Sequence, residues 1–463
     1  MTVHPALSDA APVVLWLDDE ARPEANDPLT STTTADLAVV GGGYTGLWTA
    51  LRAKERDPGL DVVLVEAGTC GWQASGRNGG FVSASLTHGY ANGQERWPEE
   101  LATLDRLGAE NLDGIDQAIK RYGIDCNWER TGELDVATRA HEVTGLREHA
   151  KALTAAGHEV EWLEREQVQS LVASPTYLAG LLDRRGVAMV EPARLAWGLR
   201  RACLDLGVRI YENSRVTELD TDGATVRLVT RHGQVLARQV ALATSAFPAL
   251  LSRLAMLTVP VYDYVLATEP LSPQQRAAIG WTGRHGIGDG GNLFHYYRLT
   301  REDRILFGGY DAVYHYGSRI DPALEQDGAT HALLAQHFFE TFPQLEGLRF
   351  SHKWAGVIDT CTRFTAFWGT AYSGRVTYAL GYTGLGVGAS RFGADVMLDL
   401  LAGVETERTR LRMVREKPLP FPPEPARYAG ITLTRWSLDR ADRSGQRNLW
   451  LRTLDKCGLG FDS

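Results

Sequence analysis

Three glycines and one acidic residue near the start of the chain have the types and spacing to bind a dinucleotide. Gly41, Gly43 and Gly46 follow a short β-branched apolar run at G-x-G-x-x-G spacing. The first allows a tight turn, the second lets a pyrophosphate approach the backbone, and the third lets a helix pack on the strand. Glu66 ends a second apolar run, where a carboxylate can accept both ribose hydroxyls of an adenosine. The pattern predicts NAD or FAD and disfavours NADP.

These residues must be positioned by a strand, a helix and a second strand. Residues 37–40 are apolar enough for a buried parallel strand, and residues 44–56 carry apolar side chains on one helical face. Pro58 and Gly59 break the chain before a second buried strand at 61–65. The helix would point its free N–H groups and partial positive charge at the phosphates.

The stretch after Glu66 separates FAD from NAD. A simple NAD domain would continue into another strand and helix, whereas this chain continues through small, hydrogen-bonding residues, ending in ASGRNGG at 74–80. Such a loop can lie against a large flat ring system. Residues 36–80 resemble the FAD-binding N-terminus of the D-amino-acid oxidase / glycine oxidase / sarcosine oxidase superfamily. They are most similar to its γ-glutamylputrescine oxidase-like branch, and the resemblance extends over roughly residues 16–403.

A second glycine cluster, GYTGLGVG at 381–388, lies between an expected strand at 378–381 and an expected helix at about 390–401. Bare backbone amides at a helix N-terminus suit the flavin edge where negative charge develops on reduction. The resemblance further implies contacts from the backbone of Val216 and from the strand that ends at Ala243 and Thr244. The predicted FAD contacts are therefore Gly41, Gly43, Tyr44, Thr45, Gly46, Glu66, Ala67, Ser75, Gly76, Arg77, Asn78, Gly79, Gly80, Val216, Ala243, Thr244, Gly381, Tyr382, Gly384, Gly386 and Val387.

The predicted fold class is α/β (α+β overall), with a Rossmann-like FAD-binding domain interleaved with an antiparallel-sheet substrate domain. We expect a leader at 1–35, an FAD-binding domain made of 36–125, 187–255 and 353–405, a substrate domain made of 126–186 and 256–352, and a C-terminal linker with helices at 406–463. The basic amphipathic helices near the end could touch a membrane or another subunit, but packing on the protein's own body is favoured.

The superfamily resemblance implies oxidation of a C–N bond in an amine or amino acid. The substrate amine binds neutral, hydride moves to flavin N5, and the imine hydrolyses, with O2 as the expected acceptor and H2O2 as product. Alternatives are a dehydrogenase using a quinone or carrier acceptor, and a flavin monooxygenase or biosynthetic N-modifying enzyme. Sarcosine oxidase-like relatives place a lysine over the flavin, and the matching strand here, 305–310, has none.

The catalytic candidates lie on expected strands and loops of the substrate domain: His295, Tyr297, Arg298 and Arg363. Strand alternation puts His295 and Tyr297 on one face and Tyr296 and Arg298 on the other; we favour the first pair. For each candidate a purely structural role is the competing interpretation, and Arg363 could equally glue the domains together.

Two further residues bear on the substrate and the cofactor. Glycine oxidase-like enzymes hold the substrate carboxylate with an arginine, whose position falls here at Ile358. A substrate without an α-carboxylate, such as an acylated diamine, is therefore expected, with any anionic group near Arg298 or Arg363. Cys361 is out of register with the cysteine that some relatives link to FAD, so the FAD is expected to be non-covalent.

Composition excludes several classes. The chain has 463 residues and a formal net charge of −9, which disfavours nucleic-acid binding. It has no apolar run long enough to span a membrane and no recognisable signal peptide. The five cysteines are scattered without a C-x-x-C pair, which indicates a reducing compartment with neither disulfides nor a metal site. A cytoplasmic protein is expected.

Overall fold

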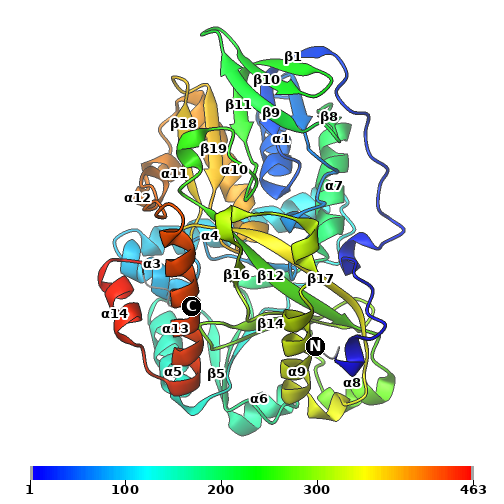
Figure 1. Ribbon diagram of the computed structural model, residues 1–463, viewed down its shortest axis with the longest axis vertical. Coiled ribbons are helices and arrows are strands. Elements are labelled where there is room, and N and C mark those ends of the chain that lie inside the picture. Colours follow the sequence, from blue (N-terminus) through cyan, green and yellow to red (C-terminus); the bar gives the residue numbers. More distant parts are fainter. Residues whose placement is uncertain (1–3, 460–463) are drawn as a thin grey trace.

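The computed structural model describes residues 4–459, and two large sheets dominate it (Figure 1). In the first sheet five neighbouring strands run parallel, and β18 joins antiparallel at one end. The strand order is β18 (Phe367–Ala371), β19 (Val376–Leu380), β11 (Gln234–Leu242), β1 (Thr32–Val40), β2 (Val62–Val65) and β8 (Arg209–Tyr211), with β10 (Val226–Thr230) and β9 (Val216–Thr221) attached at β11. This is the expected dinucleotide-binding architecture.

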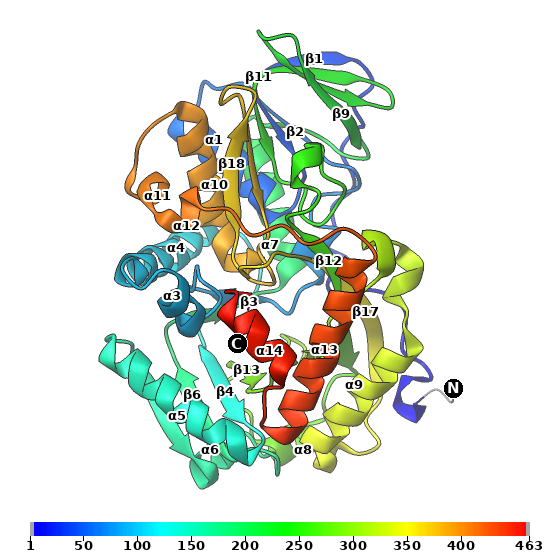
Figure 2. The same ribbon diagram turned by 60° about the vertical axis from the view of Figure 1, so that its left-hand side comes forward.

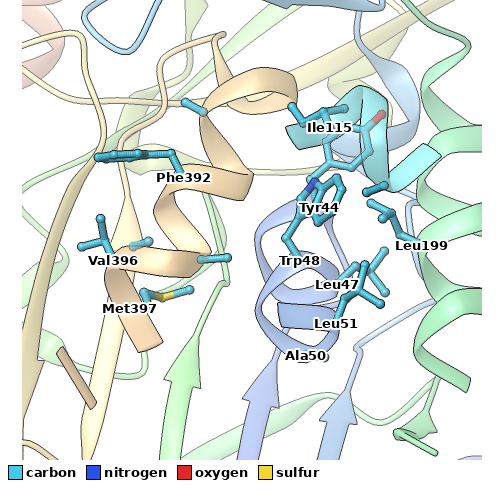
Figure 3. Packing of buried hydrophobic residues seen from close by; sticks show 14 of the residues in the cluster. Tyr44, Leu47, Trp48, Ala50, Leu51, Ile115, Leu199, Phe392, Val396 and Met397 are labelled. Atoms are coloured by element: carbon cyan, nitrogen blue, oxygen red, sulfur yellow. The ribbon is translucent and has the colours of Figure 1, made fainter. Parts of the chain in front are cut away.

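Helices pack on this sheet because their apolar faces match its buried strands. The helices of this half are α1 (Tyr44–Arg56), α2 (Ala74–Arg77), α3 (Tyr90–Arg96), α4 (Leu101–Arg121), α7 (Pro192–Asp205) and α10 (Gly386–Ala402). Figure 3 shows Leu47 and Leu51 of α1 beside Leu199 of α7, all three fully buried. Gly43 is the N-cap of α1, so the helix begins directly after the glycine turn.

The second sheet is antiparallel except where β13 pairs with β4. Its order is β16 (Val313–Tyr314), β12 (Val259–Thr268), β15 (Ile305–Gly309), β14 (His295–Leu299), β13 (Gly286–Asp289), β4 (Glu133–Ala137), β6 (Ala179–Asp183) and β5 (Val160–Glu164). On one face of this sheet Leu134, Ile287 and Phe307 belong to an apolar core that also contains residues of α9 (Gly328–Thr341). Three shorter helices accompany this half: α5 (Ala140–Ala155), α6 (Arg165–Leu171) and α8 (Pro273–Ile279).

Two parts of the chain differ from the sequence-based boundaries. Residues from 353 were assigned to the nucleotide-binding half, but β17 (Phe350–Thr360) pairs along β12 in the second sheet, from Phe350 opposite Thr268 to Thr360 opposite Val259. The chain crosses to the first sheet only with β18. The sequence predicts one helix from about 322 to 342. The structure has a 3-10 turn, Pro322–Glu325, followed by α9, because the Asp327 side chain caps a new helix by accepting from the N–H groups of Ala329 and Thr330.

The C-terminal segment folds back onto the molecule, as expected. The C-terminal helices are α11 (Glu407–Arg410), α12 (Arg412–Arg415), α13 (Ala426–Ser444) and α14 (Leu449–Lys456). Separately, β3 (Phe81–Ser83) and β7 (Val187–Met189) form a two-stranded antiparallel sheet that links the halves. Figure 2 shows α13 and α14, in red, lying beside the second half of the molecule. Leu438, Ala441 and Leu451 form a small buried cluster with Leu293. In residues 4–459 no helix is long and apolar enough to cross a membrane.

A buried ion pair fixes the loop beside Glu66. Glu212, only 1% exposed, accepts hydrogen bonds from the backbone N–H of Cys70 at 2.6 Å and of Asn26 at 2.5 Å. The Arg200 guanidinium donates to it at 2.8 Å. Removing one partner of such a pair leaves a buried charge uncompensated, which costs far more than losing an exposed pair.

We predict that Glu212→Ala lowers the free energy of unfolding by about 3–5 kcal/mol, because Arg200 and two backbone donors lose their acceptor. A denaturant titration followed by circular dichroism measures the change. Asp220→Ala, which breaks the exposed pair with Arg227, is the control and should leave the transition midpoint in place. Equal midpoints for the two variants would show that the buried pair does not hold the loop.

Candidate active site

The carboxyl ends of β1, β2 and β11 form a cradle with the N-terminus of α1. Gly41 has φ +109°, and a Cβ there would lie 2.4 Å from the carbonyl oxygen of Ala243. At Gly43 a Cβ would meet only the Ser75 hydroxyl, at 3.0 Å. The backbone at Gly43 is thus open on the side where α1 presents its N–H groups, which is the cradle that a pyrophosphate requires.

Glu66 lies at the end of β2, 7% exposed, and borders the same cavity. Its carboxylate accepts from the backbone N–H of Gly42 at 2.5 Å and of Gly68 at 2.7 Å, and from Trp72 Nε1 at 2.8 Å. Burial raises the pKa of Glu66, while these donors oppose that shift. A carboxylate has about four lone-pair sites, so one stays free for a ribose hydroxyl.

One cavity of about 2150 Å³ runs from this cradle onto the second sheet. Ligand pockets for drug-sized molecules are roughly 300–1,000 Å³, so this cavity can hold a dinucleotide with a substrate beside it. Seventeen of the predicted FAD contacts line it: Gly41, Gly43, Tyr44, Thr45, Glu66, Ala67, Ser75, Arg77, Asn78, Gly79, Val216, Ala243, Thr244, Tyr382, Gly384, Gly386 and Val387.

The other four predicted contacts, Gly46, Gly76, Gly80 and Gly381, are not on the cavity wall. Each lies instead where protein groups approach each other closely. A Cβ on Gly46 would lie 1.8 Å from the Gly41 carbonyl oxygen, and one on Gly80 would lie 2.2 Å from that of Val190. Their function in this structure is therefore to let the cradle form.

The loop at 74–80 is held between the two halves. Residues 74–77 form the helical turn α2, where only a flexible loop was expected. The Ser75 hydroxyl accepts from the Tyr44 N–H at 2.9 Å, and Arg77 forms a 2.6 Å ion pair with Glu325. A Cβ on Gly79 would lie 2.5 Å from the ring of Tyr296, so this glycine lets the loop pass directly against the second sheet.

The second glycine cluster also forms a helix N-terminus at the cavity. Helix α10 begins at Gly386, earlier than expected, and Gly384 has φ +93°. The Gly381 N–H donates to the Asp359 carboxylate at 2.6 Å. Burial raises the pKa of Asp359 to about 7. The cluster thus presents backbone amides to the cavity, and the Gly381 N–H holds the Asp359 carboxyl group next to them.

Tyr296 and Asp263 form the polar pair on the second-sheet side of the cavity nearest the Gly79 loop. The Tyr296 hydroxyl donates to Asp263 Oδ2 at 2.5 Å, and both residues line the cavity. Burial raises the pKa of Asp263 to about 6, although the Tyr296 hydrogen bond lowers it. We predicted the opposite face of β14. The signal for the face that lines the cavity is Gly308, a strand glycine where a Cβ would lie 2.6 Å from the Tyr296 ring.

His295 and Tyr297 therefore point away from the cavity, contrary to the face we favoured. His295 Nδ1 lies 2.6 Å from an Asp289 carboxylate oxygen, and its Nε2 lies 2.9 Å from His337 Nδ1 of α9. The Tyr297 hydroxyl lies 2.8 Å from that of Tyr177. Both side chains lie on the face that packs toward α9, where each has polar partners of its own.

Arg298 and Arg363 are also absent from the cavity wall. Arg298 is fully buried and donates to the Val190 carbonyl at 2.6 Å and to the Gly80 carbonyl at 3.4 Å, so it ties the end of the 74–80 loop to the segment before α7. Arg363 donates to the carbonyls of Thr365 and Glu416 and stacks on Trp97. Burial lowers the pKa of both guanidiniums to about 10. Neither is placed to hold a substrate anion; Arg363 instead ties the C-terminal segment to the body.

The remaining wall comes from α13 and α14. Ile431, Thr434, Leu438 and Leu454 line the cavity on this side. Asp442 of α13 accepts from the backbone N–H groups of Asn292 and Leu293, both at 2.9 Å, which anchors the helix to the loop before β14. The C-terminal helices thus close the cavity from the side opposite the cradle.

Comparisons with known proteins agree with this geometry. Residues 36–400 match the model of the DAO family, described as FAD dependent oxidoreductase. Over 385 residues the chain is 34% identical to gamma-glutamylputrescine oxidoreductase of Escherichia coli K12, covering 81% of this chain and 86% of the relative. Glycine oxidase of Geobacillus kaustophilus is 27% identical, over 63% of this chain and 78% of that protein.

Solved structures show the same fold. The crystal structure of glycine oxidase from Geobacillus kaustophilus superposes with a TM-score of 0.66 at 21% identity, covering 83% of this chain and 99% of that one. L-proline dehydrogenase from P. horikoshii superposes with a TM-score of 0.65 at 16% identity, covering 82% and 95% of the two chains. The resemblance, the fold class and the FAD cofactor expected from the sequence are confirmed. The chain belongs to the DAO family of FAD-dependent oxidoreductases, and acts on an amine or an amino acid.

Proposed function

We propose that this enzyme oxidises the C–N bond of an amine that lacks an α-carboxylate. The observation that carries the proposal is the charge of the substrate side of the cavity. Ile358 lines the cavity at the position where glycine oxidase-like enzymes carry the arginine that holds the substrate carboxylate. The acidic residues Glu133, Asp135 and Asp263 line the second-sheet face of the cavity. A substrate α-carboxylate beside Ile358 would find no arginine at that position and would lie near the Asp263 carboxyl group, and burying a carboxylate unpaired costs several kcal/mol.

When bound in the cradle, FAD would supply the acceptor for a hydride from the carbon beside the nitrogen, and the imine that remains would hydrolyse in water. Asp263 and Tyr296 hold the reacting amine, because they are the polar pair beside the Gly79 loop. An amine enters mainly as an ammonium ion and must lose a proton before hydride transfer. A carboxylate with a pKa of about 6 is suited to take that proton at neutral pH.

We propose FAD contacts at the seventeen predicted residues that line the cavity, and non-covalent attachment. Cys361 supports the latter, because its buried thiol donates to the Thr365 carbonyl at 3.1 Å and burial raises its pKa, so it stays protonated and poorly nucleophilic. O2 is the proposed acceptor, supported by relatives named as oxidases. A dehydrogenase is the second candidate, because among the described residues that line the cavity there is no lysine. Location in the cytoplasm stays a prediction from the sequence.

The proposal is tested by mixing the holoenzyme without air with an amine and with its α-carboxylated analogue. We expect the amine to bleach the flavin with a kcat/KM at least ten times that of the amino acid, about 1.4 kcal/mol in transition-state binding. Recovery of colour in air with stoichiometric H2O2 supports an oxidase, whereas recovery over many minutes supports a dehydrogenase. A tenfold preference for the amino acid would refute the assignment of substrate.

We predict that Gly43→Val gives a folded, colourless protein, because the only protein atom near a Cβ there is the Ser75 hydroxyl while the side chain enters the pyrophosphate path. FAD content per mole of purified protein measures the effect. Gly145→Ala, at a helical position of α5 with open space around it, should stay yellow. Normal FAD content in Gly43→Val would disprove the cradle.

We predict that kcat/KM falls below about pH 6, since Asp263 must be ionised to accept a proton and burial raises its pKa to about 6. Tyr296→Phe removes the hydrogen bond that favours the charged carboxylate, so this acidic limb of the kcat/KM pH profile should move to higher pH. Asp263→Asn should lose the limb and roughly 10²–10⁴-fold in kcat/KM. An unchanged limb in both variants would assign the proton acceptor elsewhere.

A further inference from the structure

Two carboxyl groups on β4 face the cavity without a partner. Glu133 and Asp135 line it, while the residues that alternate with them, Leu134 and Val136, are fully buried in the core of the second half. Neither carboxyl group accepts a hydrogen bond or pairs with a cation within residues 4–459. Asp183 of the next strand differs, because it accepts from the backbone N–H groups of Arg185 and Gly186.

The two groups converge above a glycine. Gly288 of β13 is in register with Asp135 on one side and with Tyr296 on the other. A Cβ on Gly288 would lie 3.4 Å from Asp135 Oδ1 and 3.7 Å from Glu133 Oε1, so both carboxyl groups lie over this residue. The Tyr296 ring lies over Gly308 instead, toward Asp263. The part of the cavity beside Gly288, here called the slot, is therefore bounded by Tyr296 on one side and by the two acids on the other.

Within residues 4–459, no cation or hydrogen-bond donor balances the two carboxyl groups of the slot. Burial and the neighbouring carboxyl groups raise the pKa of Asp135 to about 7 and raise the pKa of Glu133 well above its usual range. Paired acids enclosed by protein are stable as anions only with donors or a cation nearby. Among the described residues no group of three histidine, cysteine or acidic side chains could hold a metal ion, so the chemistry of the slot fits an organic cation with several N–H donors.

We propose that Glu133 and Asp135 bind a second ammonium group at the far end of the substrate. This inference rests on the proposed oxidation of an amine held by Tyr296 and Asp263. Tyr296 and Asp135 are two strands apart, about 10 Å at the usual strand spacing. The substrate class is thus a diamine, or a derivative with a free distal ammonium, whose two nitrogens are separated by a few methylene groups.

The experiment compares 1,4-diaminobutane with butylamine, which has the same carbon chain and one nitrogen fewer. Binding to the holoenzyme is followed by perturbation of the flavin spectrum, and reduction by bleaching without air. We expect the wild-type enzyme to half-saturate with the diamine at a concentration at least tenfold lower than with butylamine. Glu133→Gln and Asp135→Asn should each raise the half-saturating concentration of the diamine tenfold or more and leave that of butylamine within twofold.

Glu148→Gln is the matched control, because it removes the same charge from an exposed residue on the rim of the same cavity. It should change neither value, and unchanged FAD content in all variants shows that the fold is intact. Equal affinity of the wild-type enzyme for the two amines would overturn the inference and leave the proposed function standing, as would a diamine preference insensitive to both substitutions. Failure of both amines to bind or to bleach the flavin would overturn the proposed function as well.

Discussion

The close approach of two backbone segments at the first glycine turn is the constraint on which the rest of the structure depends. A Cβ on Gly46 would lie 1.8 Å from the Gly41 carbonyl oxygen, and one on Gly41 would lie 2.4 Å from that of Ala243. Only glycine allows α1 to begin this close to β1 and β11. This contact fixes the N-terminus of α1, and with it the direction of the N–H groups. The 74–80 loop, bonded to Tyr44 through Ser75, then passes against Tyr296 and joins the two sheets into one cavity.

The cavity is polarised along its length. At one end the N-termini of α1 and α10 present backbone donors and partial positive charge, which suit the phosphates and the electron-rich edge of FAD. At the other end the second sheet contributes Glu133, Asp135 and Asp263, which repel anions and attract ammonium groups. In the proposed function this arrangement would orient an amine with its nitrogen away from the phosphates. Arg298 and Arg363, which we expected near any anionic group of the substrate, donate to backbone carbonyls instead.

The sequence was sufficient for features set by local chemistry. The glycine spacing predicted α1 with its observed bounds, because each glycine has a distinct steric task, whereas β1 begins at Thr32, inside the segment expected to be a leader. Features set by tertiary pairing were not predictable in this way. Strand alternation separated Tyr296 from His295 correctly, but which face meets the cofactor depends on how the sheet docks against the 74–80 loop. Likewise β17 reads as a strand in either half, and only its register with β12 assigns it to the second sheet.

The C-terminal helices lie beyond the part of the chain that the family model matches, residues 36–400, and yet they line the same cavity. Helix α13 is held through Asp442, whose carboxylate accepts from two consecutive backbone N–H groups at 292 and 293. Those residues precede β14, which carries Tyr296. The wall that closes the cavity is therefore tied to the strand that carries the polar pair, and a shift of α13 would also move the end of that strand. The space between Tyr296 and the α13 wall is thus bounded by a segment outside the residues that the family model matches, whereas the glycine cradle proposed to bind FAD lies within them.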